Sequence, residues 1–380
     1  MAKAAALEEF HAVWNEEPAG IWSAPGRVNL IGEHTDYNDG LVLPFAIDSR
    51  TYVAARPRGD YKVSVASGID PGRTVEWDRH RESPSGRGWA SYVFGVVRAL
   101  GGTQHSGVDI VITSDIPVGS GLSSSAALEC ATAVALRDLW NTQHSDEDLA
   151  AAGTWAENQV VGAPTGVMDQ LASMLGRESH AVLIDCQRGT NSLVPLGFAA
   201  ANLQCVVIDS HQRHDHSSGE YAQKRAACEQ AAEILGIRSL REIQDSELTH
   251  ALFELPATLR PLVRHVVTEN ARVEQAVEAL GRKDFSTLGR ILDKSHASLK
   301  DDFGVSTDYL DRIVTAATQG GAIGARLVGG GFGGSVMALV EESDVGKLHQ
   351  SISDLTDPSM PHPATVRVVA PSDGARPHAK

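Results

Sequence analysis

The 380-residue sequence has few cysteines, and no two of them form a Cys-x-x-Cys pair. They are Cys130, Cys186, Cys205 and Cys228. Such scattered cysteines argue against a disulfide framework and are typical of reduced, mostly buried side chains. The sequence also lacks an apolar run of membrane-spanning length, and its first residues lack the apolar core of a secretion signal. We therefore expect a cytoplasmic protein.

Positive charge is also scarce, with 33 basic residues against 48 acidic ones and a formal net charge of -15. This balance excludes a general electrostatic attraction to nucleic acid or to an anionic membrane. Any phosphate binding must therefore depend on a local arrangement of donors. The hydrophobic share of 42% and the charged share of 21% are ordinary for a globular protein, and the length allows two domains.

Helical and strand patterns occur in both halves of the chain. Helical spacing is found at residues 4–16, 89–100, 124–140, 146–161, 167–175, 219–235, 259–280, 284–300 and 307–319. Strand patterns are found at residues 20–24, 41–47, 52–57, 62–66, 108–113, 181–185, 203–209, 325–328, 335–340 and 365–369. Together they predict an α+β protein of two lobes, with a boundary near residues 190–200 and any active site between the lobes.

A dense group of polar side chains follows the first predicted strand. Its members are Arg27, Asn29, Glu33, His34 and Asp36. Arg27 and Asn29 share one face of a possible strand, and the chain then breaks at Gly32. Carboxylates and an imidazole packed this densely suit a ligand covered in hydroxyl groups, because each hydroxyl both donates and accepts a hydrogen bond. The alternative is a charged surface loop with internal ion pairs.

A second polar segment, residues 117–129, lies between a predicted strand and a predicted helix. Its glycines let backbone N–H groups converge, its serines add donors, and the helix N-terminus adds partial positive charge. It is not a Walker A loop, because no Gly-Lys-Ser/Thr is present. This segment predicts a polyphosphate site; the alternative is a serine-capped helix after a flexible loop.

A glycine cluster at residues 329–334 formally fits Gly-x-Gly-x-x-Gly. A dinucleotide site would need a helix after it, whereas residues 335–340 have a strand pattern. We therefore reject a dinucleotide site and predict a close backbone approach, either to a ligand or to a neighbouring motif. The histidines of His211-x-x-His214-x-His216 could hold a metal, but a solvated loop is favoured because no further ligand motif accompanies them.

The three segments resemble, in order and spacing, the three motifs of the GHMP small-molecule kinases. Residues 26–37 resemble the signature of the galactokinase family within that superfamily. The resemblance continues through residues 156–159, 166–170, 218–221, 295–302 and 330–334, and so covers essentially the whole chain. It implies a two-lobed fold in which residues 1–195 form an N-terminal lobe of mixed sheet and helices. Residues 196–380 then form a ferredoxin-like α/β sandwich lobe, with the active site in the cleft between the lobes.

The resemblance also implies transfer of the γ-phosphoryl group of ATP, with Mg²⁺, to the anomeric hydroxyl of α-D-galactose. Asp169 then faces that hydroxyl, with Arg27 as its partner. The sugar-binding positions are Glu33, His34, Asp36, Gly166, Asp169 and Tyr221. The triphosphate-binding positions are Gly119, Ser120, Gly121, Leu122, Ser123, Ser124 and Ser125. The positions that reach Mg²⁺ are Ser125 and Glu157.

Pattern alone leaves simpler roles open for Asp169, Tyr221 and Trp89. Asp169 could be an ordinary acid at a helix N-terminus. Tyr221 could be an ordinary residue of an amphipathic helix. Trp89 could border the adenine, although packing in the core is its favoured role.

Two positions depart from the family's usual pattern. Asp209-Ser210 stands where Asn-Ser is usual, and Val328 stands where a serine or threonine usually precedes the glycines. Asp209 adds a negative charge near the expected pocket, and Val328 removes a hydroxyl, so both bear on sugar selectivity. The alternatives to galactose phosphorylation are a kinase of a related sugar such as N-acetylgalactosamine and a non-catalytic galactose sensor. We expect a monomer or a weak homo-oligomer.

Overall fold

A mixed sheet with helices on both faces forms the N-terminal half of the computed structural model, which describes residues 2–68, 70, 72–80, 83–212, 219–355 and 362–378. The sheet has the order β13-β1-β3-β6-β4-β5, and its pairs are antiparallel except for β4 with β6. Its strands are β1 (Gly20–Asn29), β3 (Pro44–Pro57), β4 (Lys62–Ser67), β5 (Thr74–Asp78), β6 (Val108–Ser114) and β13 (Arg376–His378).

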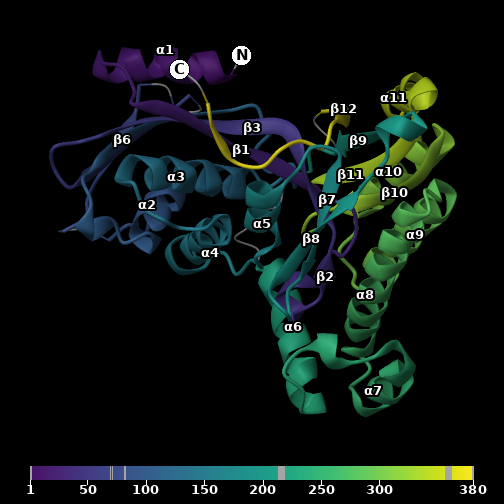
Figure 1. Ribbon diagram of the computed structural model, residues 1–380. Helices are drawn as coiled ribbons and strands as arrows, with labels where there is room; N and C mark the ends of the chain where they lie inside the picture. Colours follow the sequence, from purple (N-terminus) through teal and green to yellow (C-terminus); the bar gives the residue numbers. More distant parts are fainter. Residues whose placement is uncertain are drawn as a thin grey trace.

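Alternation along the strands gives this sheet two buried faces. Ile21 packs with Phe10 of α1 in one core, whereas its neighbour Trp22 packs in the other core. Figure 1 shows α1 on one side of the sheet and the remaining N-terminal helices on the other. The helices of this half are α1 (Ala2–Trp14), α2 (Ala90–Ala99), α3 (Ser124–Trp140), α4 (Asp146–Ala156) and α5 (Met168–Leu175).

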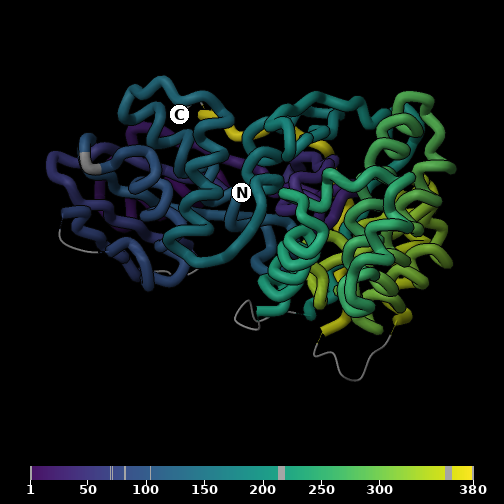
Figure 2. The backbone as a smooth tube through the Cα atoms, turned by 90° about the horizontal axis from the view of Figure 1, so that it is seen from below, coloured from purple at the N-terminus to yellow at the C-terminus, as the bar shows by residue number. Residues whose placement is uncertain are grey.

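The second half of the chain is built on a four-stranded antiparallel sheet of order β10-β11-β9-β12. Cys205 and Val207 of β9 face one core, and Val206 and Ile208 face the other. The strands are β9 (Leu203–Asp209), β10 (Ala322–Val328), β11 (Ser335–Glu341) and β12 (Thr365–Val369). The helices are α6 (Glu220–Leu235), α7 (Leu248–Glu254), α8 (Arg260–Gly281), α9 (Phe285–Asp301), α10 (Asp308–Gln319) and α11 (Val345–Ser353). Figure 2 shows the two halves side by side.

A small third sheet lies between the two halves in Figure 1 and has the order β2-β7-β8. Its strands are β2 (Leu41–Val42), β7 (His180–Asp185) and β8 (Thr190–Pro195). Short 3₁₀ turns occur at Asp36–Asn38, Gly102–Gln104, Ala199–Ala201, Leu240–Glu242, Asp245–Glu247 and Glu342–Asp344. The predicted α+β fold of two lobes is confirmed, whereas the exact division at residue 195 stays a prediction.

Two predicted boundaries are wrong for identifiable reasons. The strands expected at 41–47 and 52–57 are largely one strand, β3. The polar residues 48–51, which were expected to interrupt it, continue the strand, and three of them are buried. The guanidinium of Arg50 donates to the carbonyls of Asp373 and Gly374 at 2.8 and 2.7 Å and to the Ser23 hydroxyl at 2.8 Å. The single α-helix expected at 146–161 is α4 only as far as Ala156. A π-helical turn, Glu157–Val161, follows it directly.

Other elements were not predicted at all: β5, β8, β13, α7 and α11. Most residues of β8 are exposed, so the strand has no apolar pattern to reveal it. β13 returns from the C-terminal half to pair with β1. All four cysteines are free, as predicted. Within the described residues, no helix combines the length and apolar character that a bilayer crossing requires.

Candidate active site

A buried arginine on β1 and a carboxylate at the start of α5 form the centre of the site. Arg27 Nε donates to Asp169 Oδ1 at 2.8 Å, and Arg27 Nη2 lies 2.7 Å from the same oxygen. α5 is held against β1 because the Ser173 hydroxyl donates to the Pro25 carbonyl at 2.7 Å. Two residues that are 142 positions apart in the sequence are thereby brought together, as the resemblance implied.

The loop that precedes α3 is fastened to the same arginine. Arg27 Nη1 donates to the Gly121 carbonyl at 2.5 Å, and the Arg27 backbone N–H donates to the Leu122 carbonyl at 3.1 Å. Gly119 and Gly121 have φ values of 72° and 77°, which glycine adopts without strain. The Ser120 hydroxyl is used inside the loop, where it donates to the Pro117 carbonyl at 2.8 Å. The loop therefore has a fixed shape beside Arg27.

The helix N-terminus at this loop has no side-chain cap. Ser123 is the N-cap residue of α3, but its hydroxyl donates to Asp169 Oδ2 at 2.5 Å instead of to the helix backbone. Ser124 and Ser125 begin the helix and are partly buried. The first N–H groups of α3 thus keep the capacity to bind an anion, which the partial positive charge of a helix N-terminus favours.

The glycine cluster packs against the loop before α3, residues 117–123, here called the phosphate loop after its predicted ligand. This close approach to a neighbouring motif is one of the two alternatives that the sequence predicted. A Cβ atom on Gly121 would lie 3.1 Å from the Val328 carbonyl oxygen, and one on Gly329 would lie 3.4 Å from Gly121. The Ser335 hydroxyl donates to the Ser120 carbonyl at 2.6 Å. The strand β11 that follows confirms that the cluster is not a dinucleotide site. The cluster links the C-terminal sheet to the phosphate loop.

The sugar-signature loop, residues 32–41, begins where β1 has ended. Gly32 has a φ of 102°, and a Cβ there would lie 2.6 Å from the Leu41 carbonyl oxygen, so the turn requires glycine. Glu33 follows and is almost fully buried. Its Oε1 accepts the Gly329 backbone N–H at 2.8 Å and lies 3.1 Å from Nη2 of Arg326, which is fully buried. A buried carboxylate that is paired in this way is stable only while its partners remain.

Asp36 lies against Gly166 at the edge of this loop. A Cβ atom on Gly166 would lie 1.8 Å from Asp36 Oδ2, so the carboxylate occupies the space that any side chain would need. Burial, together with the nearby charges of Asp169 and Glu33, raises the pKa of Asp36 to about 7. The coupling to Asp169 and Glu33 shows that the three carboxylates share one region.

His34 stands in an aromatic cluster at the same place. Its ring lies 5.5 Å from the ring of Tyr221 on α6 and 4.5 Å from the ring of Phe303, measured between centroids. Its Nδ1 lies 2.8 Å from the Tyr37 hydroxyl. Burial lowers the pKa of His34 to about 3, so the imidazole is neutral at physiological pH. The predicted sugar residues Glu33, His34, Asp36, Gly166 and Tyr221 thus gather around one loop.

Glu157 and Ser125 contact each other beside the phosphate loop. The Ser125 hydroxyl donates to Glu157 Oε1 at 3.0 Å, while Glu157 Oε2 accepts from Thr165 at 2.8 Å and from Gln170 at 2.9 Å. Burial, with the charge of Asp169, raises the pKa of Glu157. The described residues contain no group of three or more His, Cys, Asp and Glu side chains placed to hold a metal. A cation here would therefore depend on ligand oxygens as well.

The two departures from the family pattern are engaged in local structure. Asp209 Oδ1 accepts the His211 backbone N–H at 2.8 Å, and the Val328 side chain is buried in the hydrophobic core. Trp89 packs against the core around α2, in agreement with its favoured role. Two histidines of the possible metal cluster, His214 and His216, lie outside the described residues.

Several residues around the sugar-signature loop were missed by sequence reasoning. Arg326 could have been found from the sequence, because a lone arginine within the apolar stretch 325–328 requires a buried partner. On α8, polar residues interrupt the buried apolar stripe and bind the loop backbone. Phe303 had no signal that separates it from a core aromatic. The other missed residues are His265, Glu269, Asn270, Thr165 and Gln170.

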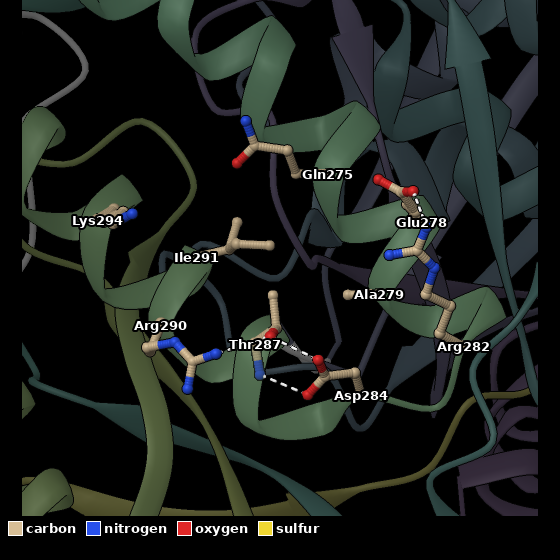
Figure 3. Close-up of a pocket in the computed structure, with 9 residues that line it drawn as sticks. All are labelled: Gln275, Glu278, Ala279, Arg282, Asp284, Thr287, Arg290, Ile291 and Lys294. Carbon is tan, nitrogen blue, oxygen red and sulfur yellow. Dashed lines mark hydrogen bonds and ion pairs between the residues drawn. The ribbon is translucent and has the colours of Figure 1, made fainter.

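A pocket of about 290 Å³ lies away from this site, between the end of α8 and the start of α9 (Figure 3). Its side chains serve the helix ends: Asp284 caps α9 by accepting the Thr287 backbone N–H at 2.9 Å, and Arg282 pairs with Glu278 at 2.5 Å. Arg290 is likewise bound to Thr287, at 2.7 Å. The pocket therefore lies at the turn between two consecutive helices, and its polar side chains stabilise the ends of those helices.

Comparisons with known proteins identify the relatives of this chain. Three family models match: the galactokinase galactose-binding signature at residues 8–57, the GHMP kinases N terminal domain at 91–177 and the GHMP kinases C terminal at 276–355. A galactokinase of Streptomyces coelicolor is 41% identical over 374 residues, which cover 97% of this chain and 97% of that protein. A galactokinase of a Roseiflexus species is 43% identical over 376 residues, covering 97% and 95%.

Solved structures show the same relationship. The crystal structure of Lactococcus lactis galactokinase complexed with galactose is similar with a TM-score of 0.94 and 32% identity, covering 99% of this chain and 100% of that one. Methanococcus jannaschii mevalonate kinase is similar with a TM-score of 0.66 and 19% identity, covering 93% and 98%. The second likeness concerns the fold alone.

Proposed function

This chain belongs to the galactokinase family of the GHMP kinases, and from that premise we propose that Asp169 and Arg27 carry the phosphoryl transfer from ATP to the anomeric hydroxyl of α-D-galactose. The protein is an ATP-dependent sugar kinase, a galactokinase that yields galactose 1-phosphate and ADP. The observation that carries the residue assignment is the contact between Arg27, Asp169 and the phosphate loop.

In the proposed reaction, Asp169 orients the anomeric hydroxyl and receives its proton as the oxygen bonds to the γ-phosphorus. The bond between the γ-phosphorus and the bridging oxygen of ADP breaks in the same transfer. Arg27 fixes one oxygen of Asp169 and adds positive charge next to the transferring group. Positioning and charge stabilisation of this kind account for most of the catalysis in phosphoryl transfer.

The nucleotide is assigned to the loop before α3. Residues Gly119 to Ser125 supply backbone N–H groups, hydroxyls and an uncapped helix N-terminus, which together favour a polyphosphate in a protein of net charge -15. Arg27 binds the Gly121 carbonyl, so the shape of this loop and the position of the reacting carboxylate depend on one guanidinium. That shared contact supports a γ-phosphate close to Asp169.

For Mg²⁺ we propose Ser125 and Glu157 as the protein's oxygen donors. Their oxygens are 3.0 Å apart, and an all-oxygen set completed by phosphate and water suits this ion. When bound, Mg²⁺ neutralises charge on the transferring phosphates. Thr165 and Gln170 hold the second oxygen of Glu157 and so turn the first toward Ser125.

For the sugar we propose contacts from Glu33, His34, Asp36, Gly166 and Tyr221. Carboxylates that accept from neighbouring hydroxyls discriminate an axial from an equatorial hydroxyl, because the wrong sugar leaves a buried group unpaired. A kinase of N-acetylgalactosamine and a silent sensor are not favoured, since the full-length relatives are galactokinases. The unpaired cysteines support a cytoplasmic, reducing compartment. The oligomeric state stays a prediction.

ADP release by the purified protein, measured with galactose, N-acetylgalactosamine and glucose, tests this proposal. We expect turnover with galactose well above that with the other two sugars. Asp169→Ala should lose at least about 100-fold in kcat, the lower end of a general-base contribution, while galactose binding measured by calorimetry largely survives. Unchanged turnover in Asp169→Ala would remove the assignment of this residue.

A further inference from the structure

One face of α8 is unusual because it buries three polar side chains within an apolar stripe. His265 and Glu269 are fully buried and Asn270 almost so, among neighbours such as Val266 and Val273. Burying polar groups is unfavourable unless each one finds a partner. Each of the three finds a backbone group of the same segment, the sugar-signature loop, more than 200 positions earlier in the chain.

Glu269 holds the start of that loop. Its Oε1 accepts the Gly32 backbone N–H at 3.0 Å and the Ser295 hydroxyl at 2.7 Å, and its Oε2 accepts from Arg272 Nε at 2.6 Å. Burial opposes the ionised form, but the positive charges of Arg272 and Arg326 lower the pKa of Glu269 to about 2. The bond to Gly32 is therefore charge-assisted, and such bonds are the stronger class.

His265 and Asn270 complete the hold on the loop. Burial lowers the pKa of His265 to about 4, so the ring is neutral, and its Nε2 lies 3.0 Å from the Glu33 carbonyl oxygen. Since a carbonyl only accepts, Nε2 carries the hydrogen and donates it. Asn270 Oδ1 accepts the Leu41 backbone N–H at 2.7 Å. Both ends of the loop are thus tied to two turns of one helix.

From this arrangement, and on the basis of the function proposed above, we propose that His265, Glu269 and Asn270, here called the α8 clamp, are positioning residues that set the affinity for the sugar. Apolar packing can keep a loop buried, but hydrogen bonds to particular backbone atoms fix where its side chains lie. The clamp bonds adjoin Glu33 and leave the phosphate loop untouched. The clamp therefore acts on sugar binding and not on nucleotide binding.

Steady-state kinetics on the full-length protein with galactose and ATP test the clamp. In Glu269→Gln an NH2 group, which only donates, replaces one carboxylate oxygen, so the charge and either the bond from Gly32 or the bond from Arg272 are lost. Asn270→Ala removes the acceptor for Leu41. We expect the KM for galactose to rise about tenfold or more in each, as for the loss of one strong hydrogen bond, with the KM for ATP within about twofold of wild type. Glu274→Gln is the matched control, because Glu274 lies exposed on the same helix; it should change neither constant.

A conservative variant separates positioning from mere packing. In His265→Gln the side-chain amide can donate to the Glu33 carbonyl in place of Nε2, so it should keep more galactose affinity than His265→Ala. An unchanged galactose KM in folded clamp variants would overturn the proposal, as would a parallel rise of both KM values. Loss of folding in all clamp variants would also overturn it, since the clamp would then serve the fold alone. Wild-type protein that fails to phosphorylate galactose would instead refute the proposed function, whatever the variants do.

Discussion

Replacing Gly166 by alanine should weaken galactose binding without unfolding the protein. The added Cβ would lie 1.8 Å from Asp36 Oδ2 and 2.3 Å from Asp36 Cγ, far inside van der Waals contact. The only atoms that it meets so closely belong to the end of a side chain, and that end can rotate away. Gly166 is also absent from the glycines with positive φ, so alanine brings no backbone strain.

The cost therefore falls on Asp36 in its proposed role as a ligand for the sugar. A carboxylate that is displaced by more than about 1 Å loses its hydrogen bonds, and a bond to a charged group contributes about 1.5–3 kcal/mol. At about 1.4 kcal/mol per tenfold, the KM for galactose should rise by roughly 10- to 150-fold. The melting temperature should change little, because no backbone atom is displaced.

Initial rates of ADP release at saturating ATP and varied galactose measure this change. Gly346→Ala is the matched control, since a Cβ on Gly346 would meet nothing within 4 Å. Its KM should equal that of the wild type. A galactose KM within twofold of wild type in Gly166→Ala would show that Asp36 does not need its present position, and the assignment of Asp36 to the sugar would fall with it.

Two further predictions concern buried charge. Arg326→Met leaves Glu33 buried without its cation and should lower the free energy of unfolding, measured by urea denaturation, by about 3–5 kcal/mol. Arg290→Met, at an exposed position, is the control. A loss below about 1 kcal/mol in Arg326→Met would contradict the importance of the ion pair. Since the pKa of Asp36 is raised to about 7, its carboxyl holds a proton below that pH and accepts fewer hydrogen bonds. The KM for galactose should therefore rise as the pH falls from about 8 to about 6, and Asp36→Asn should abolish this dependence; a flat profile in the wild type would refute it.

The sequence was sufficient to single out those parts of the candidate site that lie within short segments. Arg27, Glu33 and Asp36 stand close together in the chain, so their density alone indicated a polar ligand. The loop before α3 was recognisable from its glycines and serines, because few other residues suit a loop that would place an anion at a helix N-terminus. The break at Gly32 was also visible, since a positive φ with no room for a Cβ leaves a glycine in the sequence.

The parts that sequence could not supply depend on partners far away in the chain. Arg50 fell in the break that was expected between the strands at 41–47 and 52–57. It lies inside β3 instead, because its guanidinium donates to the carbonyls of Asp373 and Gly374. Glu269 looked like an ordinary helix residue, because nothing local shows that its acceptor is Gly32. A buried polar group is stable only through its partner, and the identity of that partner is a property of the tertiary structure.

The return of β13 to β1 has a consequence for how the polypeptide matures as it is made. Gly374 and Ala375 donate backbone bonds to the Gly176 and Ser173 carbonyls at 2.8 and 2.9 Å, at the far end of the helix that bears Asp169. These residues are synthesised after the whole C-terminal sheet. The β1 edge of the N-terminal sheet therefore stays unpaired until synthesis of the C-terminal lobe is nearly complete.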